Sequence, residues 1–247
     1  FRKLQGSWPV ISLSFSNVKA RDYTTMRGQI CQILTMLYSE NRFLLDADIL
    51  DERETEFFKE VSLGMDDVHA FMALHQMSLY LSRYYGKKVI ILLDEYDTPM
   101  QEAYVNGCWE EFTAFIRNLF NAAFKTNPYL ERALLTGTAC PALSGITRVS
   151  KESIFSDLNN LRVVTTIAEK YEDSFGFTEE EVFTALDEFG LSDQKKDVKK
   201  WYDGFTFGKR PDIYNPWSIL NFLDEKKLGL YWANTSSNSL VGKLLKE

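Results

Sequence analysis

KKVIILLDEYD, from Lys87 to Asp97, is the stretch from which the architecture of this chain is most readily inferred. Five consecutive apolar residues, Val89 to Leu93, run directly into Asp94 and Glu95. A short apolar run rich in β-branched residues is typical of a strand buried on both faces, as in parallel sheets covered by helices. Ligands of such sheets bind just outside the carboxyl ends of the strands. The sequence therefore predicts that Asp94 and Glu95 stand at the edge of the sheet where a site forms.

Four apolar residues followed by Asp-Glu are also the pattern of a Walker B strand in P-loop ATPases. There the first acid holds Mg²⁺, directly or through water, and the second acid orients the attacking water. Applied to this chain, the pattern makes Asp94 the candidate metal ligand and Glu95 the candidate catalytic residue. The alternative interpretation is that the two acids only begin a turn and cap the next helix.

The composition is that of an ordinary soluble globular protein. The 247 residues are 45% hydrophobic and 26% charged, enough for a substantial core in one large domain or two modest ones. A formal net charge of -7 argues against a general nucleic-acid binder, because the surface as a whole does not attract phosphate. No secretory signal and no membrane-spanning apolar run is present in the sequence.

Cysteine and histidine usage points to a reducing compartment and away from a zinc site. Cys31, Cys108 and Cys140 show neither zinc spacing nor a disulfide framework, which favours a cytoplasmic protein. The two histidines, His69 and His75, are six positions apart and do not share a helix face well. The chain opens on phenylalanine instead of methionine, so we expect it to be a fragment of a longer protein.

The remaining segments alternate in the manner of a parallel α/β sheet. Strands are expected at 8–15, 89–93, 132–138 and 161–167, and helices at 23–45, 66–86 and 110–125. At the tip of the strand over 132–138, Thr136 offers a hydroxyl and Gly137 lets the backbone come close to a ligand. The pattern changes near Ala168, which predicts an α/β core over 1–168 and a mainly helical C-terminal region over 169–247.

Aromatic motifs are frequent in the C-terminal region, and they allow two interpretations. Their members are Trp201, Tyr202, Trp217, Tyr231 and Trp232. Such rings stack nucleic-acid bases in some proteins, but little Lys or Arg lies between them here, so a charged groove for a strand is missing. Packing of the helical region against the sheet is the interpretation that the composition favours.

Taken together, these segments resemble the predicted AAA-ATPase-like family of bacterial proteins, which belongs to the P-loop group near the STAND-type ATPases. The matching motifs are VIILLDEYDTP (89–99), ITRVSKESIFSDLNNL (146–161), GFTEEEV (176–182), WYDGFTFG (201–208), YNPWSIL (214–220) and YWANTSSN (231–238). The resemblance covers nearly the whole chain. Members of the family often carry a PD-(D/E)XK nuclease-like domain further along, which these residues do not show.

The resemblance implies ATP and Mg²⁺ as cofactors and assigns four residues. Asp94 corresponds to the Mg²⁺ acid and Glu95 to the catalytic base or water-positioning residue. Thr136 lies where P-loop ATPases keep a polar sensor. Arg148 corresponds to an arginine that touches the γ-phosphate; the alternative is a surface arginine that pairs with Glu152 one turn later.

The sequence also departs from the family pattern. TACPALS, between Gly137 and Gly145, has the character of an insertion, and no GxxxxGK[ST] loop occurs in the chain. In the family this loop lies upstream of the strand at 10–15, so it would precede Phe1. In P-loop folds of this class, the strand that leads into this loop lies between the sensor strand and the last strand. A chain without that strand is expected to have a gap in its sheet. A chain without the loop is expected to hydrolyse ATP poorly by itself.

These features of the sequence lead to three alternative classes of function. The first is an ATPase regulatory domain that binds nucleotide and is active when complete. The second is a degenerate P-loop scaffold that binds a protein partner or a second copy of itself. The third is a two-metal nuclease site at Asp94, Glu95 and Asp97. Nucleases of the PD-(D/E)XK type need a lysine two residues after the second acid, and here Asp97 occupies that position, which argues against this class. Contact with nucleic acid is expected only through a domain outside this segment, and contact with a membrane is not expected.

Overall fold

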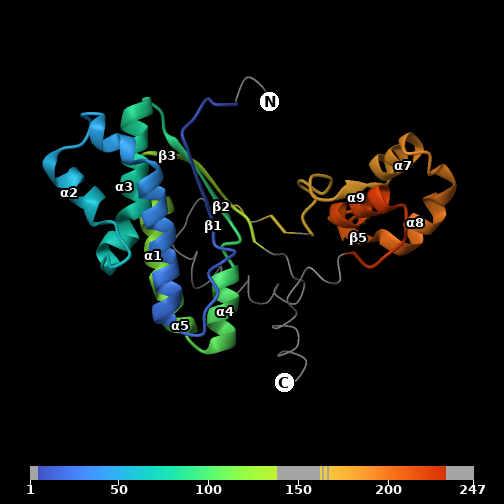
Figure 1. Cartoon of the computed structure of the whole chain (residues 1–247), viewed down its shortest axis with the longest axis horizontal. Helices are drawn as coiled ribbons and strands as arrows, with labels where there is room; N and C mark the ends of the chain where they lie inside the picture. Colours follow the sequence, from blue (N-terminus) through green and yellow to red (C-terminus); the bar gives the residue numbers. More distant parts are fainter. Residues whose placement is uncertain (1–4, 138–161, 163, 166, 232–247) are drawn as a thin grey trace. The chain divides into compact units, whose positions relative to one another are not determined.

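The computed structural model describes residues 5–137, 162, 164–165 and 167–231. Contacts within the chain divide it into two compact units, Phe1–Leu161 and Arg162–Glu247. The first is an α/β unit, and the second is mainly helical with a small antiparallel sheet (Figure 1).

The centre of the first unit is a parallel sheet of three strands in the order β1-β2-β3. Its strands are β1 (Val10–Ser14), β2 (Val89–Asp94) and β3 (Leu130–Leu135). The predicted α/β fold with a parallel, helix-flanked sheet is confirmed. Because all three strands run in one direction, their carboxyl ends meet at one edge of the sheet.

Helices supply both connections between these strands. Between β1 and β2 lie α1 (Tyr23–Glu40), the short helix η1 (Arg42–Asp46), α2 (Glu52–Glu60) and α3 (Asp67–Tyr85). Between β2 and β3 lie α4 (Thr98–Asn106), α5 (Trp109–Phe120) and η2 (Asn121–Lys125). The side chains of Asp22 and Asp66 cap α1 and α3, and Gly86, at a φ of 64°, ends α3.

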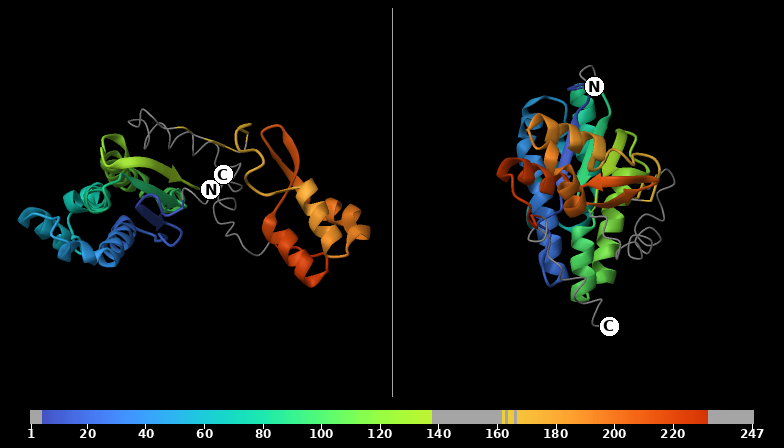
Figure 2. Two further views of the ribbon diagram at one scale, coloured as in Figure 1. Left: turned by 90° about the horizontal axis from the view of Figure 1, so that it is seen from above. Right: turned by 90° about the vertical axis from the view of Figure 1, so that its right-hand side faces the viewer.

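Strands β1 and β2 are buried mainly on one face and β3 is exposed on both, so the prediction of burial on both faces is wrong for the described part of the sheet. Along β2, Ile91 is fully buried, but Leu92 is 36% exposed, and Leu134 on β3 is 59% exposed. Helices α1, α3 and α5 lie on one side of the strands (Figures 1 and 2). The physical reason is the strand order. The connection from β1 to β2 and the connection from β2 to β3 both step toward the same side of the sheet, and right-handed connections that step the same way place their helices on the same face.

The strand predicted at 161–167 is not present among the residues that are described there. Arg162, Val164 and Thr165 lie in no strand, and Ile167 is 84% exposed. An apolar run forms a strand only where a neighbouring edge pairs with it, and the pattern does not say whether that edge exists. Among the described strands, β1, β2 and β3 pair in that order, so the gap expected between the strand of Thr136 and a last strand lies beyond them and stays a prediction.

His69 joins the end of α2 to the start of α3. Its Nε2 lies 2.7 Å from Glu60 Oε2, its Nδ1 lies 2.9 Å from Asp66 Oδ1, and its ring stacks on Phe57. Burial disfavours the protonated ring, but the hydrogen bonds to Asp66 and Glu60 outweigh it and raise the pKa of His69. The protonated ring therefore ties the two helices together.

This geometry predicts a pH-dependent stability. A group whose pKa is raised by folding stabilises the fold fully below its unfolded pKa of about 6.5, and that contribution is lost as the pH rises through the folded value. We expect the free energy of unfolding of the wild type to fall from pH 6 upward more steeply than that of His69→Gln. Urea unfolding of both proteins at several pH values measures the difference, and parallel pH profiles would contradict it.

The second unit combines short helices with an antiparallel sheet of strand order β4-β6-β5. Its elements are β4 (Phe177–Thr178), α7 (Glu179–Glu188), η4 (Ser192–Gln194), α8 (Lys195–Tyr202), β5 (Asp203–Phe207), β6 (Arg210–Tyr214) and α9 (Pro216–Glu225). Thr178 and Glu181 form the capping box that begins α7.

The aromatic motifs divide between core and surface. Tyr202 belongs to the core of the second unit, and Tyr231 packs against that core, so both rings are used within this unit. Trp201 and Trp217 are 47% and 54% exposed, so packing does not account for them. Trp232 lies outside the described residues.

Candidate functional site

The carboxyl ends of the three strands of the first unit bring polar side chains together. Ser14 at the end of β1 is paired in register with Asp94 at the end of β2. On the other side, the backbone N–H of Thr136 donates to Leu93 O at 2.9 Å, which places Thr136 directly after β3 and beside β2. We call Ser14, Asp94, Glu95 and Thr136 the strand rim. Asp94 lies at its centre, between the other two strand ends.

Asp94 and Thr136 are in direct contact, although they are 42 positions apart in the sequence. Thr136 Oγ1 donates a hydrogen bond of 2.5 Å to Asp94 Oδ1, which also accepts from the backbone N–H of Glu95 at 3.0 Å. Among the described residues, Asp94 Oδ2 accepts no hydrogen bond. Asp94 is exposed, and carboxylate oxygen is a ligand that Mg²⁺ prefers, so Oδ2 is suited to a hard cation or to one of its water molecules.

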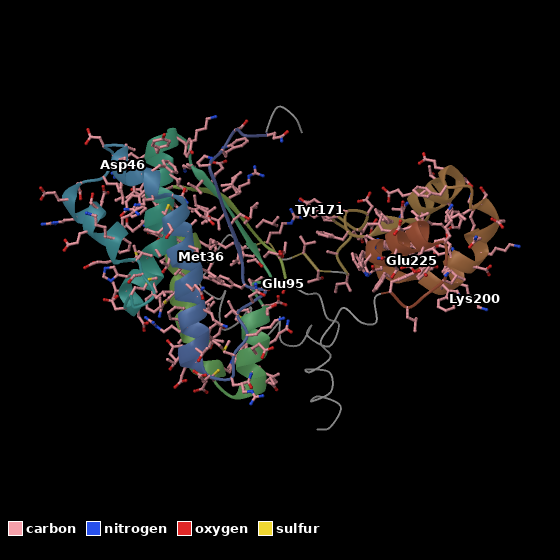
Figure 3. All side chains as sticks on the ribbon, in the orientation of Figure 1. Met36, Asp46, Glu95, Tyr171, Lys200 and Glu225 are labelled. Atoms are coloured by element: carbon pink, nitrogen blue, oxygen red, sulfur yellow. The ribbon has the colours of Figure 1, made fainter. Side chains whose placement is uncertain are left out.

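Glu95 follows Asp94 in a left-handed backbone conformation, with a φ of 49°. A residue with a Cβ atom is disfavoured there, and such conformations cluster at functional sites. Its carboxylate Oε2 accepts a hydrogen bond of 2.9 Å from Thr98 Oγ1. Glu95 thus lies where the strands end and α4 begins (Figure 3).

The turn after Glu95 is attached to the end of β3 in two places. The backbone N–H of Tyr96 donates to Thr136 O at 3.1 Å. Burial, and then the charge of Asp97, raises the pKa of Tyr96 to about 12, so its hydroxyl stays neutral. The buried Asp97 carboxylate packs against Gly137: a Cβ atom added to Gly137 would lie 2.7 Å from Asp97 Oδ1. The predicted close approach at Gly137 is therefore made by a side chain of the protein itself.

The two-metal nuclease interpretation gains no support from this geometry. The described residues contain no group of three His, Cys, Asp or Glu side chains arranged to hold a metal ion. Asp97 accepts from Gln101 Nε2 at 3.1 Å and faces Gly137. One carboxylate at the rim is nevertheless enough for Mg²⁺ that is shared with phosphate oxygens.

Sequence reasoning located part of this site and missed part of it. Asp94, Glu95 and Thr136 are brought together, whereas Arg148, its alternative partner Glu152 and the insertion after Gly137 lie outside the described residues. Ser14 and Thr98 were missed as rim or turn residues. Two signals were available: Ser14 is the last polar residue of the strand predicted at 8–15, and Thr98 follows Glu95 by three positions and directly precedes Pro99.

A cavity of about 450 Å³ lies away from the rim, at the amino ends of β1 and β2. Its lining residues are Gly6, Ser7, Trp8, Pro9, Val10, Asn41, Leu81, Tyr85 and Lys87. Because none of them belongs to the rim, this cavity adds nothing to the site around Asp94.

Comparison with known sequences assigns most of the first unit to one family. A family model described as Predicted AAA-ATPase matches residues 2–155. An uncharacterized protein in the vnfD 5′ region of Azotobacter chroococcum mcd 1 is 25% identical over 240 residues. The alignment covers 97% of this chain but only 41% of that relative, so the chain spans less than half of the relative's length. No solved structure matches the chain. None of the described helices is both long and apolar enough to span a bilayer.

Proposed function

The chain belongs to the predicted AAA-ATPase family, and from this premise we propose that it binds and hydrolyses ATP as the regulatory domain of a bacterial protein. The observation that carries the proposal is the contact of Thr136 with Asp94 at the centre of the strand rim. An acid that holds Mg²⁺ against the phosphates is a recurring part of phosphoryl-transfer sites, and Thr136 would hold that acid in place.

Three of the four rim residues, and Arg148, have a role in this proposal. Mg²⁺ held by Asp94 would neutralise charge on the phosphate oxygens. Glu95 orients the attacking water and accepts its proton as the water oxygen bonds to the γ-phosphorus and the bond to ADP breaks. Thr136 holds Asp94 and responds to the γ-phosphate, and Arg148 stabilises the charge of that phosphate.

The proposal assigns the two regions different tasks. The α/β core over 1–168 binds nucleotide, and the helical region over 169–247 receives the conformational change. We place the protein in the cytoplasm, since Cys31 and Cys108 are free thiols. Nucleic acid would be reached only through a domain outside this segment.

The phosphates also need a Gly-rich loop with its lysine, which this sequence does not contain. We propose that the loop precedes Phe1 and that this segment alone turns over little ATP. Among the described strands β3 has a neighbour on one side only, which supports this, because a parallel strand added on its other side would end beside Thr136, at the rim.

The experiment is calorimetric titration of ATP into a protein extended upstream of Phe1, with and without Mg²⁺. Asp94→Asn is expected to weaken Mg²⁺-dependent binding by about 10- to 100-fold, because a neutral amide holds the ion and its water poorly. The control Glu131→Gln removes an exposed charge from β3 and should leave the affinity unchanged. Absence of ATP binding in the extended protein would refute the proposal.

The second candidate function is a P-loop scaffold that binds a protein partner, or a second copy of itself, without nucleotide turnover. The missing GxxxxGK[ST] loop is the observation in its favour. The residues before Phe1 in the source gene discriminate the two: a Gly-rich loop ending in Lys-Ser or Lys-Thr supports the ATPase, and its absence supports the scaffold.

A further inference from the structure

In the part of the chain that the structure describes, the side chain of Glu95 is held by Thr98, which follows it by three positions. Thr98 Oγ1 donates to Glu95 Oε2 at 2.9 Å, and the backbone N–H of Thr98 donates to Glu95 O at 3.2 Å. Both ends of Glu95, backbone and carboxylate, are thereby tied to the same residue.

Thr98 is itself immobilised by its surroundings. It is 8% exposed and is the first residue of α4, where it is followed at once by Pro99. Proline in the first turn of a helix fixes the backbone, and a β-branched side chain has few χ1 rotamers. The hydroxyl of Thr98 therefore has a fixed position relative to the end of β2.

Glu95 needs such a support. Its side chain has three rotatable bonds, and its backbone is held in the left-handed region at a φ of 49°. Among the described residues, the hydrogen bond from Thr98 is the contact that engages the carboxylate, and it occupies Oε2 alone. Oε1 is left for another partner.

We propose that Thr98 is the positioning residue of the ATPase site. Its hydroxyl holds Oε2 of Glu95 so that Oε1 faces the water that attacks the γ-phosphate. Thr98 touches neither nucleotide nor metal in this account and acts only through Glu95. This inference rests on the proposed function, because it assigns Thr98 a part in ATP hydrolysis and none in ATP binding.

The test compares Thr98→Val with Thr98→Ser in a protein extended upstream of Phe1. Valine keeps the shape of the side chain and removes the hydroxyl, so we expect kcat for ATP to fall by about 10-fold, with KM and Tm unchanged. Serine restores the hydroxyl and should return kcat to within about twofold of the wild type. Thr113→Val removes another buried threonine hydroxyl, on α5 away from the rim, and should change neither kcat nor KM.

The outcomes separate the two proposals. An unchanged kcat in Thr98→Val, in a wild type that hydrolyses ATP, overturns the role of Thr98 and leaves the proposed function standing. If Thr98→Val changes Tm and KM as much as it lowers kcat, or if Thr98→Ser does not restore kcat, the role of Thr98 is only structural. Either result also overturns the proposed positioning role. An extended wild type that binds no ATP and turns over none refutes both.

Discussion

Glu95→Gln is expected to lower ATP turnover by about 10²- to 10⁴-fold in a protein extended upstream of Phe1, with ATP affinity nearly unchanged. Glutamine has the shape of glutamate, and its carbonyl oxygen can still accept the hydrogen bond from Thr98. It cannot accept the proton of the attacking water. The loss should therefore fall on the chemical step and leave ground-state binding intact.

Single-turnover kinetics, with affinity measured by calorimetry on the same protein, separates these two effects. Glu110→Gln is the matched control, because Glu110 is an exposed glutamate on α5. It should behave as the wild type in both measurements. If Glu95→Gln turns over ATP at the wild-type rate, Glu95 has no part in the mechanism.

Gly137→Ala is expected to lower the free energy of unfolding by about 1–3 kcal/mol, as other overpacked sites do. The new Cβ atom would lie 2.7 Å from Asp97 Oδ1 and 2.8 Å from Asp97 Cγ, closer than real Cβ contacts. Asp97 is buried, so its carboxylate has little room to move away. The cost is steric, because Gly137 is not among the glycines of positive φ.

Two comparisons isolate this clash. Gly64→Ala should be nearly neutral in urea unfolding, since nothing lies within 4 Å of the added Cβ there. In an Asp97→Ala background the obstructing carboxylate is gone, so the cost of Gly137→Ala should largely disappear. A double-mutant cycle measures this coupling. Equal costs of Gly137→Ala in both backgrounds would show that Asp97 and Gly137 do not constrain each other.

The sheet and part of the rim could be predicted because they depend on local pattern and on a general rule. The apolar run before Asp94 and the polar tip at Thr136 each mark the end of a strand. Parallel strands end at one edge, and in the structure a hydrogen bond joins Thr136 to Asp94 at that edge.

The remaining features depend on tertiary structure that single-sequence patterns do not contain. Leu92 has the same apolar character as Ile91, and only the direction of the helical connections leaves Leu92 36% exposed while Ile91 is fully buried. The left-handed backbone of Glu95 is uncommon for a residue with a side chain, so no propensity predicts it. The packing of Asp97 on Gly137 joins a turn and a strand end 40 positions apart.

The most direct test of the central claim is the position of the metal. A crystal of the upstream-extended protein grown with Mn²⁺ and a non-hydrolysable ATP analogue would locate the ion by its anomalous scattering. The account predicts a peak at the strand rim, bound to Asp94 Oδ2 directly or through one water, with the γ-phosphate beside Thr136. A peak elsewhere, or a nucleotide seated in the cavity at the amino ends of β1 and β2, would contradict it.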